Sequence, residues 1–278
     1  GQLVAVPGST QGDLSATAPS RGTSNATALL SRAAALLLPV LRDLREQPGG
    51  LVLDEVPDAL LLKALLVNSA RWGVPAQSYQ EVVKSLENSG NLSEHLARFL
   101  GFGCVVLDAI GQCTGSRATA LSGGILAIDQ GAEHHFPLPP SLSGKRGPRR
   151  LVVTLAWLTP TRPSNQRYRC TQLWFDAPKS KMPVGSKEHL ERTNGDWQAV
   201  QRGTVQHEIF EGEKAAAFVD GDEVTIRVSC REDIKGSSGS VPYALVVTLE
   251  VDEAMKLDIY AEVQERVKTK LAVAIQGR

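Results

Sequence analysis

A serine beside a glycine-bearing loop occupies the position in this chain that is best suited to chemistry. Ser24 follows Gly22 and Thr23 and opens a long stretch rich in Ala and Leu, which predicts a helix. At a helix N-terminus the unpaired backbone N–H groups and the helix dipole both stabilise negative charge. A nucleophilic serine there would bring part of an oxyanion hole for acyl transfer. Serine is also among the commonest N-cap residues, and position alone favours a plain helix cap.

The residues around Ser24 resemble the nucleophile segment of the subtilisin-like serine proteases, the subtilases. The similar segment runs from Gly22 to Ala28, and Val6-Pro7-Gly8 stands where the family has a Pro-Gly turn. Leu62–Ala70 is similar to the helix that follows the nucleophile helix in the family. Gly101–Ala109 is similar to the Gly-x-Gly segment that closes the family's catalytic domain. The resemblance covers residues 1–112 and favours Ser24 as a nucleophile.

This resemblance implies a serine endopeptidase that hydrolyses peptide bonds with an Asp-His-Ser triad. Ser24 would attack the scissile carbonyl, its backbone N–H would bind the oxyanion, and Thr23 and Gly22 would line the cleft. The family's Asp, His and oxyanion Asn precede the serine in sequence. The chain would therefore supply only the serine. Its partner would be the upstream half of the same protease, as a separate or covalently joined chain. Polypeptide would be the substrate, with Ser15–Arg21 bordering the cleft.

The chain departs from the family at Asn25 and Ala28, where Met and Pro are usual. These departures leave open a second hypothesis, in which the protein is a catalytically inactive subtilase-like scaffold. A third hypothesis gives the function to the C-terminal part of the chain, as a β-sandwich that binds a protein partner.

Two apolar helices are expected to position the serine, over Asn25–Glu46 and over Pro57–Trp72. Both carry so little polar surface that we expect them to be buried. Pro39 is expected to kink or divide the first helix, because a proline inside a helix removes a hydrogen bond. The parallel sheet that such helices cover in subtilases is almost wholly missing from this chain. Residues 1–112 alone should therefore aggregate or bind a partner.

The pattern after Gly115 changes to short β-branched or aromatic segments separated by Gly, Pro, Asn and Asp. This spacing predicts an antiparallel β-sandwich or jelly roll. Asp220-Gly221 is a hairpin signal. The expected strands are Thr119–Ile128, Glu133–Leu138, Leu151–Leu158, Tyr168–Phe175, Val205–Phe210, Ala215–Val219, Val224–Ser229 and Tyr243–Val251.

The predicted fold class is thus the α/β C-terminal portion of a subtilisin-like domain, mostly helices in this chain, followed by the β-sandwich. The predicted domains are 1–114, the subtilase-like part, 115–254, the sandwich, and 255–278, a C-terminal helix. Shorter helices are expected over Tyr79–Asn88 and Ser93–Leu100, and the last helix over Ile259–Ile275.

The other chemically capable residues favour structural roles. The histidines are His95, His134, His135, His189 and His207, and we expect each to be a surface or structural residue. His134 and His135 are neighbours on a predicted strand, so their side chains diverge and a metal site is disfavoured. Asp220 and Asp222 could bind calcium, but the hairpin turn already accounts for them. We expect no cofactor. The loop with Lys145-Arg146 and Arg149-Arg150 is expected to be a solvated basic loop.

The composition is that of an ordinary soluble globular protein. The chain has 278 residues, of which 42% are hydrophobic and 22% charged, and its formal net charge is zero. This balance removes the electrostatic case for a nucleic acid or an anionic membrane as partner. The apolar runs Leu29–Leu41 and Leu60–Val67 fall short of the ~20 residues that a membrane span needs.

The ends and the cysteines of the chain give weaker expectations. The chain begins at Gly1 and its first methionine is Met182, so we expect a processed chain or a fragment. Four cysteines without a CxxC spacing predict reduced, buried thiols rather than zinc ligands. They are Cys104, Cys113, Cys170 and Cys230. The sequence leaves the compartment unknown, with a cytoplasmic location slightly favoured.

Overall fold

The computed structural model describes residues 2–85, 92–110, 113–166, 168–176, 203–212, 219–235 and 239–276. Contacts divide the chain into two compact units, Gly1–Arg42 and Asp43–Arg278. The sequence placed its first boundary between residues 114 and 115, whereas this division falls inside the first long helix. All strand pairs in the described residues are antiparallel, so the antiparallel, β-rich part of the predicted fold is confirmed.

The first unit consists of a hairpin and most of helix α1. Strand β1 (Gln2–Ala5) pairs with β2 (Thr17–Ser20), and α1 extends over Thr23–Glu46. Thr17–Ser20 has no strand pattern of its own. Its pairing with β1 decides its conformation.

Helix α1 differs from its prediction in two respects. Pro39 lies inside one continuous helix, so the expected division of the helix there is wrong. Only Ala33, Leu37 and Leu41 are buried, which corrects the expectation of a buried helix. Leu29, Leu30, Leu36 and Val40 are exposed large hydrophobic residues of this helix. By length and composition α1 is apolar enough to cross a bilayer, a test that core helices of soluble proteins also pass.

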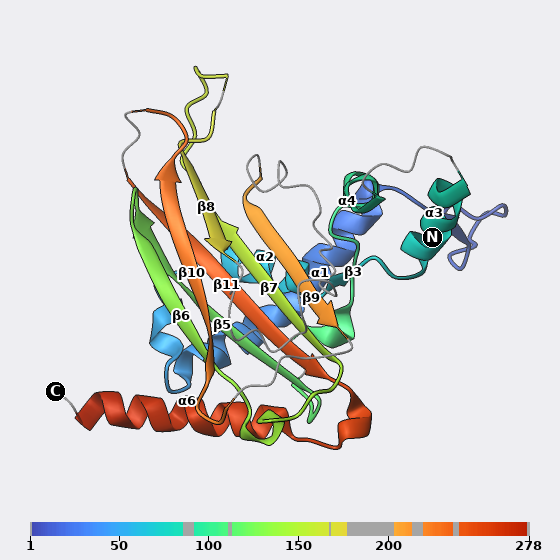
Figure 1. Ribbon diagram of the computed structural model, residues 1–278. Helices are drawn as coiled ribbons and strands as arrows, with labels where there is room; N and C mark the ends of the chain where they lie inside the picture. Colours follow the sequence, from blue (N-terminus) through green and yellow to red (C-terminus); the bar gives the residue numbers. More distant parts are fainter. Residues whose placement is uncertain are drawn as a thin grey trace. The chain divides into compact units, whose positions relative to one another are not determined.

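The second unit is built on two facing antiparallel sheets, which we call the sandwich (Figure 1). The four-stranded sheet has the order β5-β11-β7-β9, and the three-stranded sheet has the order β6-β10-β8. The bounds are β5 Arg117–Ala127, β6 Gly131–Pro137, β7 Arg149–Trp157, β8 Thr171–Asp176, β9 Val205–Gly212, β10 Glu223–Glu232 and β11 Ser240–Val251. Each predicted strand is confirmed within a few residues except Ala215–Val219, most of which lies outside the described residues.

The core of the sandwich comes from the alternating apolar positions of both sheets. Leu155, Trp157 and Leu245 of the larger sheet meet Leu173 and Ile226 of the smaller one, and all five are fully buried. Alternation places one side chain in two on the inner face of each strand.

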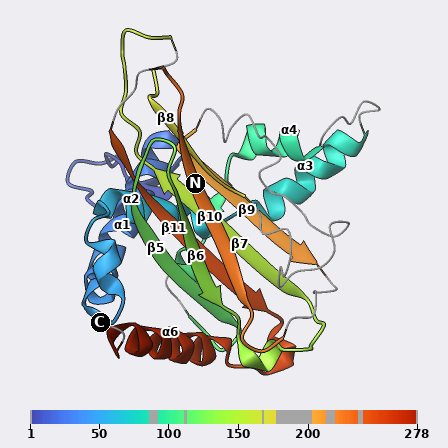
Figure 2. The same cartoon turned by 60° about the vertical axis from the view of Figure 1, so that its left-hand side comes forward.

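Helix α2 (Asp58–Asn68) covers the other face of the four-stranded sheet, against β7 and β11 (Figure 2). Four of its five leucines are buried, as expected, but against an antiparallel sheet of its own unit. Gly123 of β5 permits this packing, because a Cβ there would lie 2.8 Å from Cγ2 of Val56. The larger sheet is thus covered on both faces, by the smaller sheet and by α2.

A helical pair extends from the end of α2. Strand β3 (Ala70–Arg71) pairs with β4 (Cys104–Val105), and between them lie α3 (Gly73–Ser85) and α4 (Leu92–Leu100). The ring of Tyr79 on α3 stacks on that of Phe99 on α4, with centroids 4.7 Å apart. Both predicted helices are confirmed with shifted bounds.

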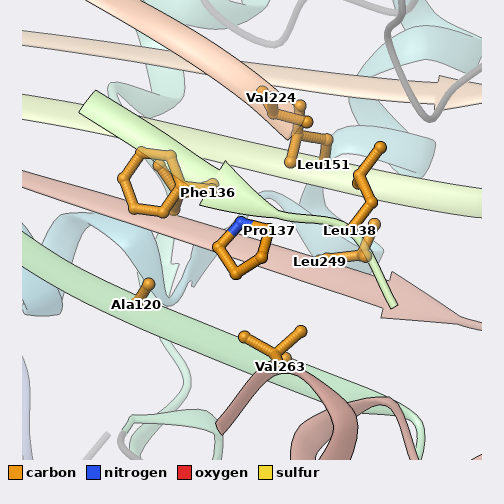
Figure 3. Close-up of a pocket in the computed structure, with 10 residues that line it drawn as sticks. Ala120, Phe136, Pro137, Leu138, Leu151, Val224, Leu249 and Val263 are labelled. Atoms are coloured by element: carbon orange, nitrogen blue, oxygen red, sulfur yellow. The ribbon is translucent and has the colours of Figure 1, made fainter. Parts of the chain in front are cut away.

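Helix α6 (Ile259–Gln276) crosses one end of the sandwich (Figure 1). Ile259 is fully buried there, and the carboxylate of Glu262 accepts a hydrogen bond from the Ser141 N–H at 3.0 Å. An apolar cavity of about 30 Å³ lies between α6 and the sheets, with Val263 on one side and Ala120 and Leu249 among its lining (Figure 3). Its size is that of a packing gap.

Candidate functional site

Ser24 lies in the first turn of α1, where the chain leaves β2. Gly22 makes this turn with a φ of 149°, in the region that favours glycine, and its carbonyl oxygen accepts the Ala26 N–H at 3.2 Å. Because this is the first hydrogen bond of the helix, the N–H groups of Thr23, Ser24 and Asn25 have no acceptor within the helix. Ser24 is exposed, so its Oγ is accessible at the positive end of α1.

The residues next to Ser24 differ in how their polar groups are satisfied. The Thr27 hydroxyl donates to the Thr23 carbonyl oxygen at 2.8 Å. Nδ2 of Asn25 is buried and has no hydrogen-bond partner among the described residues. A buried donor left without an acceptor costs about 1–3 kcal/mol. In the sequence Asn25 stood out only as a departure from the family pattern. The signal for its polar role is that its amide directly follows the candidate nucleophile Ser24.

The loop between β1 and β2 is held by its own polar groups. The Val6 N–H donates to the Ala16 carbonyl oxygen at 3.0 Å. Asp13 accepts hydrogen bonds from the Ser15 hydroxyl at 2.8 Å and the Ser15 N–H at 2.9 Å, and these bonds lower the pKa of Asp13. A Cβ on Gly8 would lie 2.5 Å from Cβ of Asp13, so only glycine fits there.

Residues 1–42 contain Ser24 but no histidine, and Asp13 is their only acidic residue. The described first unit therefore offers a nucleophile and backbone donors without a general base.

His207 is buried beneath α2 in a polar network. Asn68 Nδ2 donates to Thr154 Oγ1 at 3.1 Å, and Thr154 Oγ1 lies 2.8 Å from His207 Nδ1. Burial, with the charges of Arg71 and Arg150, lowers the pKa of His207 to about 3. His207 is a neutral structural histidine.

His134 joins the two sheets. Its Nε2 is 2.8 Å from the Tyr243 hydroxyl and its Nδ1 is 3.0 Å from Ser122 Oγ. Burial raises the pKa of Tyr243 to about 12 and lowers the pKa of His134. Ser122 and Tyr243 belong to the larger sheet and His134 to the smaller one, so these two hydrogen bonds tie the sheets together.

The remaining histidines are less enclosed. His135 is exposed, with Nδ1 3.1 Å from Thr225 Oγ1 and 3.6 Å from a Glu223 carboxylate oxygen. His95 is exposed on α4. His189 lies outside the described residues.

Three arginines surround the carboxylate of Glu250 on the α2 side of the sheet. Arg71 approaches to 3.2 Å, Arg117 to 3.4 Å and Arg150 to 3.8 Å. Desolvation first, then the charge of Arg150, lowers the pKa of Arg71 to about 10. Arg71 also donates to the Asn68 carbonyl oxygen at 2.8 Å and so fastens the end of α2 to β11.

The sequence predicted that the four basic residues at 145–150 form one solvated loop, and this prediction is wrong for two of them. Arg149 is 2% exposed, and its guanidinium donates to the carbonyl oxygens of Leu142 and Lys145. Arg150 belongs to the group around Glu250. Only Lys145 and Arg146 are exposed, because β7 begins at Arg149 and takes the following residues into the sheet.

The residues considered for metals and thiol chemistry are dispersed. Among the described residues, no group of three or more His, Cys, Asp and Glu side chains could hold a metal ion. Asp222 closes the turn at Gly221 with its N–H on the Val219 carbonyl oxygen at 3.0 Å. The strand pairing predicted before this turn falls largely outside the described residues. All four cysteines are free, with Cys170 and Cys230 buried as expected but Cys104 exposed.

No protein-family model and no curated protein sequence matches this chain. Among solved structures, the chain is similar to a chain of the cyanophage Pam1 capsid asymmetric unit, with 15% identity and a TM-score of 0.24, over 49% of this chain and 83% of that one. It is also similar to dimeric latent PorU from Porphyromonas gingivalis, with 9% identity and a TM-score of 0.22, over 49% of this chain and 13% of that one. TM-scores this low do not establish a shared fold.

Proposed function

We propose that this chain supplies the nucleophilic serine of a subtilisin-like serine endopeptidase. Ser24 is the nucleophile, and its backbone N–H is one donor to the oxyanion, with Thr23 and Gly22 bordering the cleft. A second polypeptide segment, the upstream half of the protease, supplies the histidine base, its aspartate and the oxyanion asparagine. The single observation that carries this proposal is the position of Ser24, exposed in the first turn of α1 after the positive-φ Gly22.

The free backbone donors at this turn support the proposal chemically. When Ser24 Oγ attacks a peptide carbonyl, the oxygen of that carbonyl gains negative charge while the hydroxyl proton passes to the histidine base. The N–H groups at the start of α1 are unpaired by the helix and lie at its positive end, where they can stabilise that charge.

The surface of α1 supports the need for a second segment. Its exposed residues Leu29, Leu30, Leu36 and Val40 are large and apolar, and the described part of the chain offers no acceptor to the Asn25 Nδ2 donor. An upstream half that packs on α1 would remove this apolar surface from water and could provide the missing acceptor.

Fluorophosphonate labelling of Ser24 tests the proposal. Intact mass should show one adduct when the chain and its upstream half are present together. Ser24→Ala should abolish the adduct, and Ser31→Ala, an exposed serine farther along the same helix, should retain it. A complex of both halves that takes no label at Ser24 would overturn the proposal and favour the inactive scaffold.

A further inference from the structure

Ser122, His134 and Tyr243 bring a hydroxyl, an imidazole and a phenol together at one margin of the sandwich. Strand β5, which carries Ser122, and strand β6, which carries His134, are terminal strands of the two sheets. Ser122 Oγ lies 3.0 Å from His134 Nδ1, and the Tyr243 hydroxyl lies 2.8 Å from Nε2 of the same ring. A nucleophile within hydrogen-bond reach of a base, with a third group on that base, is the arrangement that covalent catalysis uses.

The two groups that would react are partly open to solvent and are in a suitable protonation state. Ser122 and His134 are each partly exposed, whereas Tyr243 is buried. Burial, followed by the charge of His135, lowers the pKa of His134, so its ring is neutral at neutral pH. A neutral imidazole has one unprotonated nitrogen. When the ring proton is on Nε2 and is donated to the Tyr243 oxygen, Nδ1 can accept the proton of Ser122.

An apolar cavity follows this pair along the inner faces of the same two strands. Ala120 precedes Ser122 by two residues and Phe136 follows His134 by two, so each shares a strand face with its neighbour. Both line the cavity of about 30 Å³ (Figure 3). This volume is about that of one water molecule in the liquid, which leaves room for a methyl group but not for a long chain. The apolar lining suits an alkyl group and disfavours a charged one.

We propose that Ser122 and His134 cleave esters of short acyl groups such as acetyl. Ser122 Oγ bonds to the ester carbonyl carbon while its proton passes to His134 Nδ1. The bond to the leaving oxygen breaks as that oxygen takes the proton from Nδ1, and acetyl-Ser122 remains. Water then attacks the same carbon and gives a proton to Nδ1, which returns it to Ser122 Oγ as acetic acid leaves. Both residues lie in the second unit, so this site is independent of the upstream half proposed for Ser24.

Acetylation by p-nitrophenyl acetate tests the site in the full chain alone. The wild type should release a burst of p-nitrophenolate and carry acetyl on Ser122, which peptide mass spectrometry locates. Ser122→Ala should abolish the burst. Ser116→Ala is the matched control and should retain it, because Ser116 is also partly exposed but its hydroxyl lies 3.2 Å from Thr114 Oγ1 instead of a histidine. Ser24→Ala should also retain it, and a wild-type chain without acetyl on Ser122 would overturn the proposal whatever the state of Ser24.

Two measurements test His134 as the base. His134→Gln should slow acetylation of Ser122 by about a hundredfold or more, and the exposed neighbour variant His135→Gln should react at nearly the wild-type rate. Because His134→Gln also removes contacts between the sheets, the second measurement uses the wild type. Its acetylation should be about twofold slower in D₂O, since a proton moves in that step. An unchanged rate in a folded His134→Gln, or in D₂O, would show that His134 only ties the sheets together.

The cavity sets the length of the acyl group. p-Nitrophenyl hexanoate should acylate Ser122 about tenfold or more slowly than the acetate does, because its chain exceeds the cavity. Ala120→Val fills the cavity without altering either reacting side chain and should slow acetylation by about tenfold. Ala127→Val, on the opposite face of β5, is the control and should leave the rate unchanged. Equal rates for both esters, or for Ala120→Val and wild type, would contradict the preference for short acyl groups.

Discussion

Helices α1 and α2 are both rich in leucine and alanine, yet they end in opposite environments. Leu60 and Leu61 of α2 are fully buried against the four-stranded sheet, whereas Leu36 of α1 is 61% exposed. Composition sets the free energy that a helix gains from being covered, but the cover has to be supplied by a surface. The sandwich supplies it to α2. The exposed face of α1 is the physical reason for proposing a second segment around Ser24.

The largest expected difference in stability is between truncating a leucine in α2 and truncating a leucine in α1. Leu61→Ala should lower the free energy of unfolding by about 2–5 kcal/mol, because it leaves a cavity under α2. Leu36→Ala should change it by less than about 0.5 kcal/mol in the chain alone. Urea unfolding of both variants measures the contrast. Equal losses would show that α1 is covered in the isolated chain.

Acid should weaken the α2 contact through His207. Its folded pKa of about 3 lies below the ordinary value near 6.5, so the unfolded state binds the proton first as the pH falls. Stability is full above about pH 6.5 and declines toward pH 3, by about 2 kcal/mol at pH 5. His207→Gln should flatten this part of the pH profile, and the exposed His135→Gln should not. A profile unchanged in His207→Gln would contradict the assignment.

Glu250→Gln should cost about 1–2 kcal/mol, because it leaves Arg71, Arg117 and Arg150 without the carboxylate that they share. The loss should be larger at low salt, where repulsion among the arginines is less screened. Thermal unfolding at two ionic strengths measures it. A loss that does not depend on salt would mean that Glu250 acts by packing alone.

The smallest effect is expected between the two sheets, away from α2. Tyr243→Phe removes the hydrogen bond to His134 and should cost about 1 kcal/mol while leaving the core shape unchanged. Exchange of the β6 amides should increase more than exchange of the β7 amides. The opposite order would show that this bond does not hold the smaller sheet.

The elements themselves could be predicted from local pattern. Short β-branched or aromatic segments between turn residues marked β7 and β11. Gly101 and Gly103 follow the end of α4, and their φ values are 59° and 96°. Strand β2 could not be predicted, because its strand state comes from pairing with β1 rather than from its own residues. The polar network of Asn68, Thr154 and His207 was also out of reach, since these residues are far apart in sequence and meet only when α2 lies on the sheet.

The sequence by itself determined that Ser24 stands at a helix start, that two helices need apolar cover, and that the later residues form antiparallel strands. These are properties of spacing over a few residues, where the backbone and the nearest side chains set the energy. Only the tertiary structure decided that α2 is covered by an antiparallel sheet and that α1 is left exposed. Each of these depends on which surfaces meet, and that depends on contacts between residues distant along the chain.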